Sequence, residues 1–267
     1  MQPDRRFARR VAARTGLGVK FVAKDTVLSV ALKALEGLLD EGYVMKGGTA
    51  IARAGFLDTP RFSEDVDLDV YSDLGLRELG RGFHRLLKGL GDFEISPPRY
   101  KGAGLRIDAH YINVLGDRDR IRLELSPRPA DGLDGDEVSQ TLLQSPFTSG
   151  EASLIWCYTR EALFARKMHA LSGRFDGKDP FDLRGLWRGG MDPSDGLGAL
   201  VRYVGNESLS MGDLMDSAVD NLHRMRADLK AVANSTNHFI PRSSRPDWGA
   251  LLEDVGTIVA TIRDGVR

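Results

Sequence analysis

Two short segments of the chain carry residue types that could bind a triphosphate together with its metal ions. Lys46-Gly47-Gly48-Thr49-Ala50 is typical of a glycine-rich turn that joins a strand to a helix. Arg61-Phe62-Ser63-Glu64-Asp65-Val66-Asp67 follows after the length of one short helix. Glycines let the backbone approach a phosphate, and a helix N-terminus offers free N–H groups with partial positive charge. The order of the two segments therefore indicates nucleotidyl transfer.

Asp65 and Asp67 begin a segment in which acidic and aliphatic residues alternate. This period is that of a strand, so both carboxylates project from one face. Carboxylates this close repel each other unless a cation lies between them, and Mg²⁺ often shares one or two carboxylates with substrate phosphates. A solvent-facing acidic strand is the alternative, because Asp-x-Asp also occurs at 67/69, 117/119 and 134/136.

The glycine segment also has an explanation that needs no ligand. It could be an ordinary strand-to-helix turn in which Thr49 is the helix N-cap. In the functional interpretation, Thr49 adds a hydroxyl donor for a phosphate. The spacing is not that of a Walker A loop, because no Gly-Lys-Ser/Thr follows four residues after the first glycine.

Hydrophobic periodicity predicts the elements that must position these segments. We expect a helix at 25–40 with Asp25 as its N-cap, strands at 43–45 and 65–70, helices at 49–55 and 76–90, and a hairpin formed by 105–114 and 121–125. Residues 127–150 are rich in Pro, Gly, Ser and Asp and indicate a linker or long surface loop. The expected fold class is α/β (α+β), with a small mixed sheet and helices at 1–135 and a mostly helical domain at 136–267.

A later helix carries Lys167 among mostly apolar residues. A buried lysine needs an acidic or phosphate partner, whereas a lysine at the edge of such a helix reaches the surface instead. Arg174 lies seven residues further on and shares the side of Lys167 if the helix continues that far. Asp179 and Asp182 either serve the same site or cap the next helix.

Together these segments resemble the DNA polymerase β-like nucleotidyltransferase superfamily, whose signature is Gly-Ser/Thr followed by Asp-x-Asp. More narrowly, Lys46–Ala50 with Arg61–Leu68 resembles the AbiEii/AbiGii branch, which contains toxins of type IV-like toxin–antitoxin and phage-defence systems and includes mycobacterial tRNA-modifying toxins. The resemblance continues at Glu161–Leu171, where the family's essential lysine falls on Lys167, and at Arg174 with Lys178–Leu183. The interval between Thr49 and Asp65 is a few residues longer than is usual in the family, so we expect an enlarged turn near 56–61.

The resemblance implies an NTP-dependent nucleotidyltransferase toxin that transfers NMP to an acceptor hydroxyl, which in the resembled toxins is the 3′ end of a tRNA. It implies that Asp65, Asp67, Lys167 and Asp179 are catalytic. It implies that the NTP is bound by Lys46, Gly47, Gly48, Thr49, Ser63, Arg174, Lys178 and Asp182. It implies that Mg²⁺ is held by Asp65, Asp67 and a third acid, for which we expect Glu124 first and Asp108 second.

The resemblance also implies a cognate antitoxin and a role in a toxin–antitoxin or antiviral defence system. Two other functions fit the same residues. One is a small-molecule nucleotidyltransferase acting on a hydroxyl such as that of an aminoglycoside. The other is a nucleotide-binding module that keeps the fold without turnover.

The composition of the chain limits the remaining function classes. The net charge of the 267 residues is −1, so the protein is not a basic nucleic-acid coat. Basic residues nevertheless dominate residues 5–24, which could lie on phosphates or form a solvated helix face. The single cysteine, Cys157, lies in an apolar run and is expected to be a buried hydrophobe rather than a nucleophile. No segment has the length and apolarity of a membrane span, so we expect a cytoplasmic protein.

Overall fold

The computed structural model describes residues 4–266. The chain forms two compact units. The first contains the chain up to Gly55 together with Phe62–Tyr158, and the second contains Phe56–Arg61 together with the chain from Thr159 onward. The boundary therefore lies at 158/159, later than the predicted 135/136, and the short segment 56–61 leaves the first unit for the second.

The first unit is built around a mixed sheet. Its elements are α1 (Arg5–Thr15), α2 (Val19–Glu36), β1 (Tyr43–Lys46), α3 (Gly47–Arg53), β2 (Asp65–Tyr71), α4 (Leu76–Leu87), β3 (Glu94–Ile95), β4 (Arg99–Lys101), β5 (Gly104–Ile112), β6 (Arg118–Arg128), β7 (Val138–Leu143) and β8 (Ser153–Tyr158), with short 3₁₀ turns at Ala130–Gly132 and Gly135–Glu137. The mixed α/β class predicted from the sequence is confirmed, as is the antiparallel hairpin of β5 and β6.

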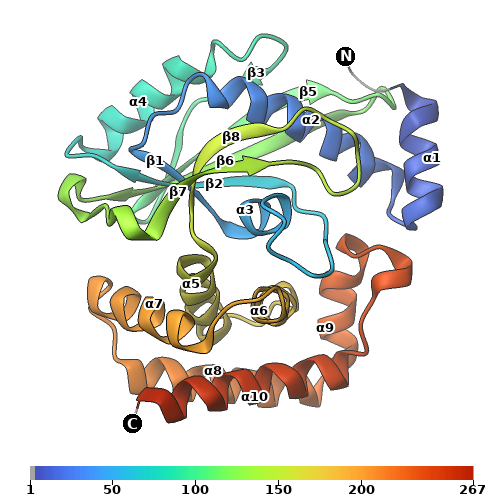
Figure 1. Ribbon diagram of the computed structural model, residues 1–267. Coiled ribbons are helices and arrows are strands. Elements are labelled where there is room, and N and C mark those ends of the chain that lie inside the picture. The colour runs from blue at the N-terminus through green and yellow to red at the C-terminus, as the bar shows by residue number, and fades with distance from the viewer. Residues whose placement is uncertain (1–3, 267) are drawn as a thin grey trace. The chain divides into compact units, whose positions relative to one another are not determined.

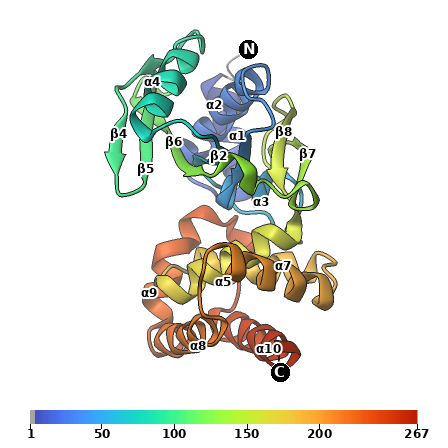
Figure 2. The ribbon, with the colours of Figure 1, turned by 90° about the vertical axis from the view of Figure 1, so that its left-hand side faces the viewer.

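The strand order places the acidic strand β2 near the centre of the sheet. The order is β3-β5-β6-β2-β1-β8-β7, and β4 pairs with β5. β2 runs antiparallel to β1 and parallel to β6, while β8 runs parallel to β1. Figure 2 shows β4 and β5 at one edge and β7 and β8 at the other.

The two faces of this sheet differ. Helices α2 and α4 lie over one face, and the short helix α3 lies on the other (Figure 1). Val66, Leu68, Leu123 and Ile107 point into the covered face and are almost fully buried. Because neighbouring residues of a strand point to opposite faces, the acidic residues between them occupy the face that carries α3.

Two predictions for the first unit are wrong. The helix predicted at 25–40 begins at Val19, and Asp25 lies inside it, buried, with an ion pair to Arg53 at 2.6 Å. Asp25 is therefore a core ion-pair partner and not an N-cap. The segment predicted as a loop at 127–150 contains the end of β6, which pairs with β2, and all of β7, which pairs antiparallel with β8.

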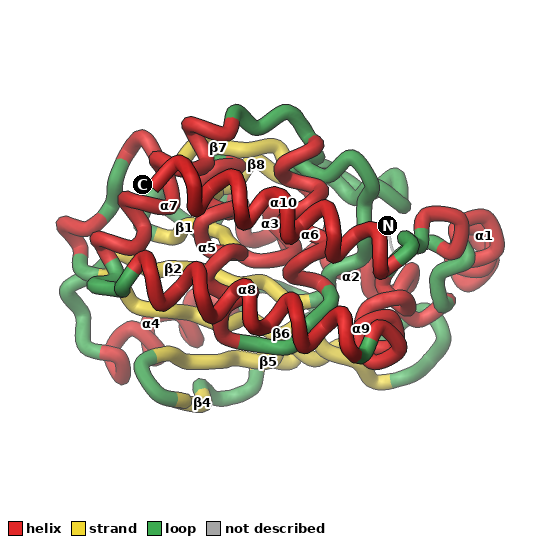
Figure 3. The backbone as a smooth tube through the Cα atoms, turned by 90° about the horizontal axis from the view of Figure 1, so that it is seen from below, coloured by secondary structure: helices red, strands yellow, loops and turns green. Residues whose placement is uncertain are grey.

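The second unit is helical after the segment Phe56–Arg61. Its helices are α5 (Arg160–Gly173), α6 (Lys178–Arg188), α7 (Pro193–Asn206), α8 (Met211–Ala227), α9 (Leu229–Thr236) and α10 (Trp248–Val266), with 3₁₀ turns at Asn237–Phe239 and Arg242–Ser244. α5 packs against α6, α7 and α8, and α10 packs against the same three helices. Figure 3 shows α8 and α10 running alongside each other. The core is aliphatic and aromatic, with Phe164, Leu186 and Val255 fully buried.

Candidate active site

Asp65, Asp67 and Glu124 lie on one face of the sheet of the first unit. In the parallel pairing of β2 with β6, Asp67 lies opposite Glu124 and Asp65 lies opposite Arg122. Residues paired across neighbouring strands project from the same face of a sheet. The backbone register therefore brings the predicted metal-binding carboxylates together, although 57 positions separate Asp67 from Glu124 in the sequence.

The environments of Glu124 and Asp108 distinguish the two candidates for the third acid. Asp108 projects from the same face but its side chain is only 1% exposed, and Arg106 donates two hydrogen bonds to it at 2.9 and 3.0 Å. Burial opposes ionisation, but these hydrogen bonds outweigh it and hold the pKa of Asp108 below its ordinary value. The Glu124 side chain is 48% exposed, and its contact with Arg122 is long, at 3.7 Å. Glu124 is thus the accessible carboxylate beside Asp67.

Asp65 is half-buried among both carboxylates and cations. Burial is the main cause that raises its pKa above the ordinary value, and the nearby carboxylates of Glu64 and Glu124 raise it further. Arg122, 3.3 Å away, and Lys24 lower the pKa but do not offset the other contributions. An added cation on this face would relieve the repulsion.

Gly47 allows the Asp67 carboxylate to lie directly against the glycine turn. Its φ of +76° is a conformation that other residues rarely adopt, and a Cβ on Gly47 would overlap the carboxylate of Asp67. Gly48 follows in the first turn of α3. The two motifs identified in the sequence are therefore in direct contact.

Thr49 is not the N-cap of α3. The helix begins at Gly47, and Lys46 occupies the cap position without a side-chain hydrogen bond. The Thr49 hydroxyl is buried and donates a 2.5 Å hydrogen bond to the main-chain carbonyl oxygen of Asp65. This hydrogen bond therefore holds α3 against Asp65, the first residue of β2.

Lys46 takes part in a buried network at the other end of β2. Its ammonium group forms an ion pair with Asp69 and a 2.9 Å hydrogen bond with the Ser126 hydroxyl. Tyr158 donates to the same aspartate at 2.8 Å. Burial would raise the pKa of Asp69, but Lys46 and Arg128 outweigh it and lower the pKa. Sequence reasoning missed Asp69, although it continues the alternation of Asp65 and Asp67.

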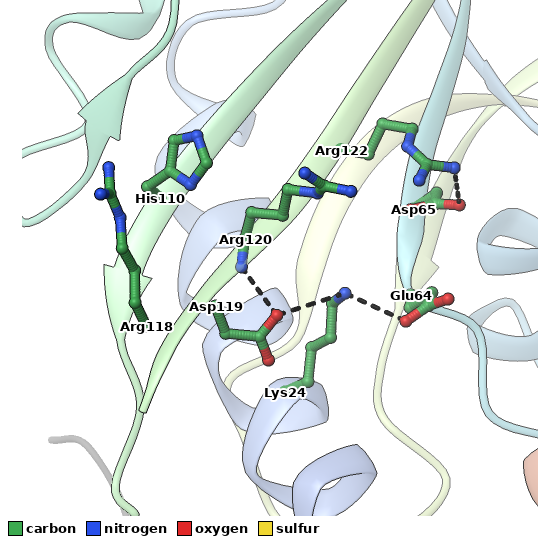
Figure 4. A pocket seen from close by; sticks show the side chains of 8 residues that line it. All are labelled: Lys24, Glu64, Asp65, His110, Arg118, Asp119, Arg120 and Arg122. Carbon is green, nitrogen blue, oxygen red and sulfur yellow. Dashed lines mark hydrogen bonds and ion pairs between the residues drawn. The ribbon is translucent and has the colours of Figure 1, made fainter. Parts of the chain in front are cut away.

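A pocket of about 560 Å³ adjoins Asp65 in the first unit. Figure 4 shows its lining, in which charged side chains from α2, β6 and the residues before β2 surround the opening. The lining residues are Lys24, Glu64, Asp65, His110, Arg118, Asp119, Arg120 and Arg122. Within it Lys24 bonds Glu64 at 3.0 Å and contacts Asp119 at 3.8 Å. Ser63 lies half-buried just before this lining.

The carboxylates fit a magnesium ion that is completed by a substrate. Within residues 4–266 no group of three or more His, Cys, Asp or Glu side chains is arranged to hold a metal ion by itself. Arg122 instead lies against both Asp65 and Glu124, at 3.3 and 3.7 Å. Two carboxylates with substrate phosphates are a common ligand set for Mg²⁺, and the chemistry of this face agrees with that set.

Lys167 belongs to a buried ion cluster in the second unit. Its ammonium group contacts Asp179 at 2.9 Å and Asp182 at 2.8 Å. Arg61 makes a two-pronged contact with Asp182 at 2.6 and 2.7 Å, and Arg174 does the same with Asp179 at 2.6 and 2.8 Å. Lys167 does not reach the surface, because its side chain is almost fully buried.

The cluster corrects the local predictions for its members. α5 ends at Gly173, so Arg174 reaches Asp179 from just beyond the helix. α6 has Gly177 at its N-cap position and no side-chain cap, so neither Asp179 nor Asp182 caps it. Lys178 points elsewhere, with Asp176 3.4 Å away and the Phe239 ring 5.0 Å away.

Sequence reasoning missed the role of Arg61. Its guanidinium group is buried. Arg61 belongs to the second unit because it ends the segment Phe56–Arg61, which enlarges the turn before β2. The sequence feature that could have indicated this role is the position of Arg61, four residues before Asp65. The first unit thus assembles Lys46, Gly47, Gly48, Thr49, Asp65, Asp67 and Glu124, and the second assembles Lys167, Arg174, Asp179 and Asp182.

Comparisons with known proteins show which family and which solved structures this chain resembles. The family described as "Nucleotidyl transferase AbiEii toxin, Type IV TA system" matches residues 31–261. MenT4, a nucleotidyltransferase toxin from Mycobacterium tuberculosis H37Rv, has a similar structure with a TM-score of 0.64 at 21% identity, covering 98% of this chain and 90% of that one.

Two structures from Helicobacter pylori share the fold as well. A putative nucleotidyltransferase gives a TM-score of 0.54 at 17% identity, covering 94% of this chain and 97% of that one. JHP933 gives 0.53 at 17% identity, covering 94% of each chain. No curated protein sequence matches the chain. In the part of the chain that the structure describes, none of the helices combines the length and apolarity needed to span a bilayer.

Proposed function

The chain belongs to the AbiEii family of nucleotidyltransferase toxins from type IV toxin–antitoxin systems, and from this premise we propose that it transfers NMP from an NTP to the 3′ end of a tRNA with the help of Mg²⁺. Family membership also implies a cognate antitoxin. The observation that carries the proposal is the register of β2 and β6, which sets Asp67 opposite Glu124 and beside Asp65.

Asp65, Asp67 and Glu124 are the residues that would hold Mg²⁺. When bound there, the ion stabilises charge on the attacking and leaving oxygens of a displacement at phosphorus. Asp65 has a raised pKa because of burial and neighbouring carboxylates, so bringing a cation to it also favours its ionised form.

The glycine turn is the proposed place for the triphosphate. Gly47 lies against Asp67 without a side chain between them, so phosphates that share an ion with Asp67 would meet the backbone of Gly47 and Gly48. Thr49 keeps this backbone in place through its bond to Asp65. Lys46 holds Asp69, and Ser63 lies at the entry to β2.

The ion cluster of the second unit is proposed to contribute positive charge. Three cations, Arg61, Lys167 and Arg174, contact the carboxylates of Asp179 and Asp182, and Asp176 adds negative charge near the two arginines. The Arg174 side chain is the exposed member. In the proposal Lys167 and Arg174 offset the charge of the triphosphate. Asp179 and Asp182 hold these two cations in position, and Lys178 begins the helix α6 that carries both aspartates.

The test is transfer of label from each of the four α-³²P-labelled NTPs to total tRNA in the presence of Mg²⁺, followed by sequencing of the product ends. We expect label at the tRNA 3′ end and a loss of at least about 10³-fold in Asp67→Ala. Asp73→Ala is the matched control, because Asp73 is an exposed acid just beyond β2. Transfer that survives Asp67→Ala would contradict the site.

The same assay separates RNA from a small acceptor. If no RNA is labelled, the reaction is repeated with aminoglycosides, and adenylation or another transfer to these would replace tRNA as the acceptor. Binding of RNA falls steeply with salt because counterions are released, so a flat salt dependence would contradict an RNA acceptor.

A further inference from the structure

Strand β6 carries a row of arginines that leads to the acidic face. Arg118, Arg120 and Arg122 are alternate residues of this strand, so they project from one face at intervals of about 6.8 Å. Their side chains are 60%, 44% and 32% exposed in turn, and the last of them contacts Asp65. The row therefore runs from open solvent to the proposed site.

These arginines have only weak partners. The contact of Arg118 with Glu94 joins two exposed side chains, and such pairs contribute little. Arg120 lies 3.8 Å from Asp108, whose carboxylate already accepts two hydrogen bonds from Arg106. Arg122 approaches Asp65 at 3.3 Å. The row keeps unused hydrogen-bond donors that could bind an anion.

The pocket that contains the row is polar throughout. Four cations and three carboxylates line it, with His110 as the only ring and no aliphatic side chain (Figure 4). Pockets for small molecules are mostly lined by apolar and aromatic side chains. A charged groove that follows a backbone is instead typical of sites for single-stranded nucleic acid.

Helices α1 and α2 carry further cations at this end of the sheet. Lys20 contacts Asp117 and Lys24 contacts Asp119, both at 3.8 Å, which ties the start of α2 to the turn between β5 and β6. Figures 1 and 3 place α1 at this end of the sheet. The arginines at positions 5, 6, 9 and 10 of α1 are exposed. Positive charge is thus available from α1 through β6 to Asp65.

We propose that the row of Arg118, Arg120 and Arg122 is the track for the acceptor RNA. It binds the phosphodiester backbone of a single-stranded 3′ end and leads the terminal hydroxyl toward Asp65 and Asp67. The inference rests on the proposed function for the identity of the acceptor, while the binding it describes can be measured without transfer.

The test compares two double variants in binding of a fluorescein-labelled single-stranded RNA of about 12 nucleotides, a length within the range of known single-strand sites. Arg118→Gln/Arg120→Gln removes two charges from the track. Arg81→Gln/Arg85→Gln removes two exposed charges from α4, which packs on the opposite face of the sheet. Fluorescence anisotropy is recorded over a range of KCl concentrations without NTP, and circular dichroism checks the fold of both variants.

We expect the track variant to bind about tenfold more weakly than the α4 variant at low salt. Each phosphate contact to a single strand contributes about 0.7 to the slope of log K against log[salt], so losing two contacts should lower the slope by about 1.4. An affinity and slope equal to those of the α4 variant would overturn the track. If this loss is seen but wild-type protein labels no RNA, the track stands and the proposed function fails.

Discussion

The acidic face of the first unit and the ion cluster of the second unit shift the pKa of their carboxylates in opposite directions. On the acidic face, Asp65 has a single close cation, and burial with neighbouring acids raises its pKa. In the cluster, burial would also raise the pKa of Asp179 and Asp182, but Lys167 and the arginines outweigh it and lower both. Burial has the larger effect on the pKa of Asp65, and the neighbouring cations have the larger effect on the pKa of Asp179 and Asp182.

This difference separates two roles that charged motifs can have. A carboxylate without full compensation destabilises the free protein slightly and gains from a bound cation. A buried carboxylate with two cations fixes those cations and is costly to remove. The first arrangement suits a site that awaits a ligand, and the second suits a scaffold that holds Lys167 at one place.

The largest expected contrast is in stability. Asp182→Ala leaves Arg61 and Lys167 buried with less negative charge, and we expect it to lower the free energy of unfolding by about 3–5 kcal/mol. Asp65→Ala removes an unfavourable charge and should change it by less than about 1 kcal/mol. Urea unfolding at pH 7 measures both. Equal losses in the free energy of unfolding in the two variants would contradict the difference between the acidic face and the ion cluster.

The next contrast concerns the backbone of the glycine turn. Gly47→Ala forces a Cβ against the Asp67 carboxylate, and we expect it to lower nucleotide transfer about 10²-fold, since small displacements of reacting groups have effects of this size. Gly55→Ala is the control, because Gly55 has a similar φ of +72° but open space where the Cβ would lie. If both variants lose activity alike, backbone strain and not the position of Asp67 is responsible.

The smallest contrast is in pH dependence, where the two regions should have opposite signs. The lowered pKa of Asp179 and Asp182 contributes stability that is present above the ordinary carboxyl pKa of 3.8 and is lost as the pH falls toward their folded values. The raised pKa of Asp65 means that the folded state holds its proton more tightly, so its contribution is lost as the pH rises through the folded pKa.

Urea unfolding of wild type and Asp65→Asn between about pH 4 and pH 7 measures the second effect. We expect the stability of wild type relative to the variant to fall over this range, by less than about 1 kcal/mol because solvent screens a partly exposed group. A rise would reverse the assigned sign. Asp179→Asn should flatten the loss of stability below about pH 4.

The sequence was informative wherever the pattern is local. The alternation around Asp65 predicted β2, and the two alternating runs before and after Gly116 predicted the hairpin of β5 and β6. The glycine turn was also recognisable, because its residues differ from those of an ordinary strand end. These features depend on neighbours only a few positions away.

The remainder depends on contacts that are distant in sequence. Choosing between Glu124 and Asp108 requires the register of β6 against β2 and the arginines around each acid. Strand β8 pairs with β1, which lies far from it in the chain, and β7 joins the sheet only through β8, so neither was recognised as a strand. Cys157 on β8 is buried, and burial raises the pKa of its thiol to about 12, which agrees with the predicted structural role.

The passage of residues 56–61 into the second unit has a consequence for biosynthesis. Arg61 bonds Asp182, which lies 121 residues later, and at about 5–20 residues per second roughly 6–24 s separate the two on the ribosome. Strand β1 likewise cannot pair with β8 until β8 has been synthesised, since Met45 pairs with Cys157. A chain that terminates before this point contains the whole acidic motif but neither the completed sheet nor the partner of Arg61. Neither unit can therefore complete these contacts until residues as far as Asp182 have left the ribosome.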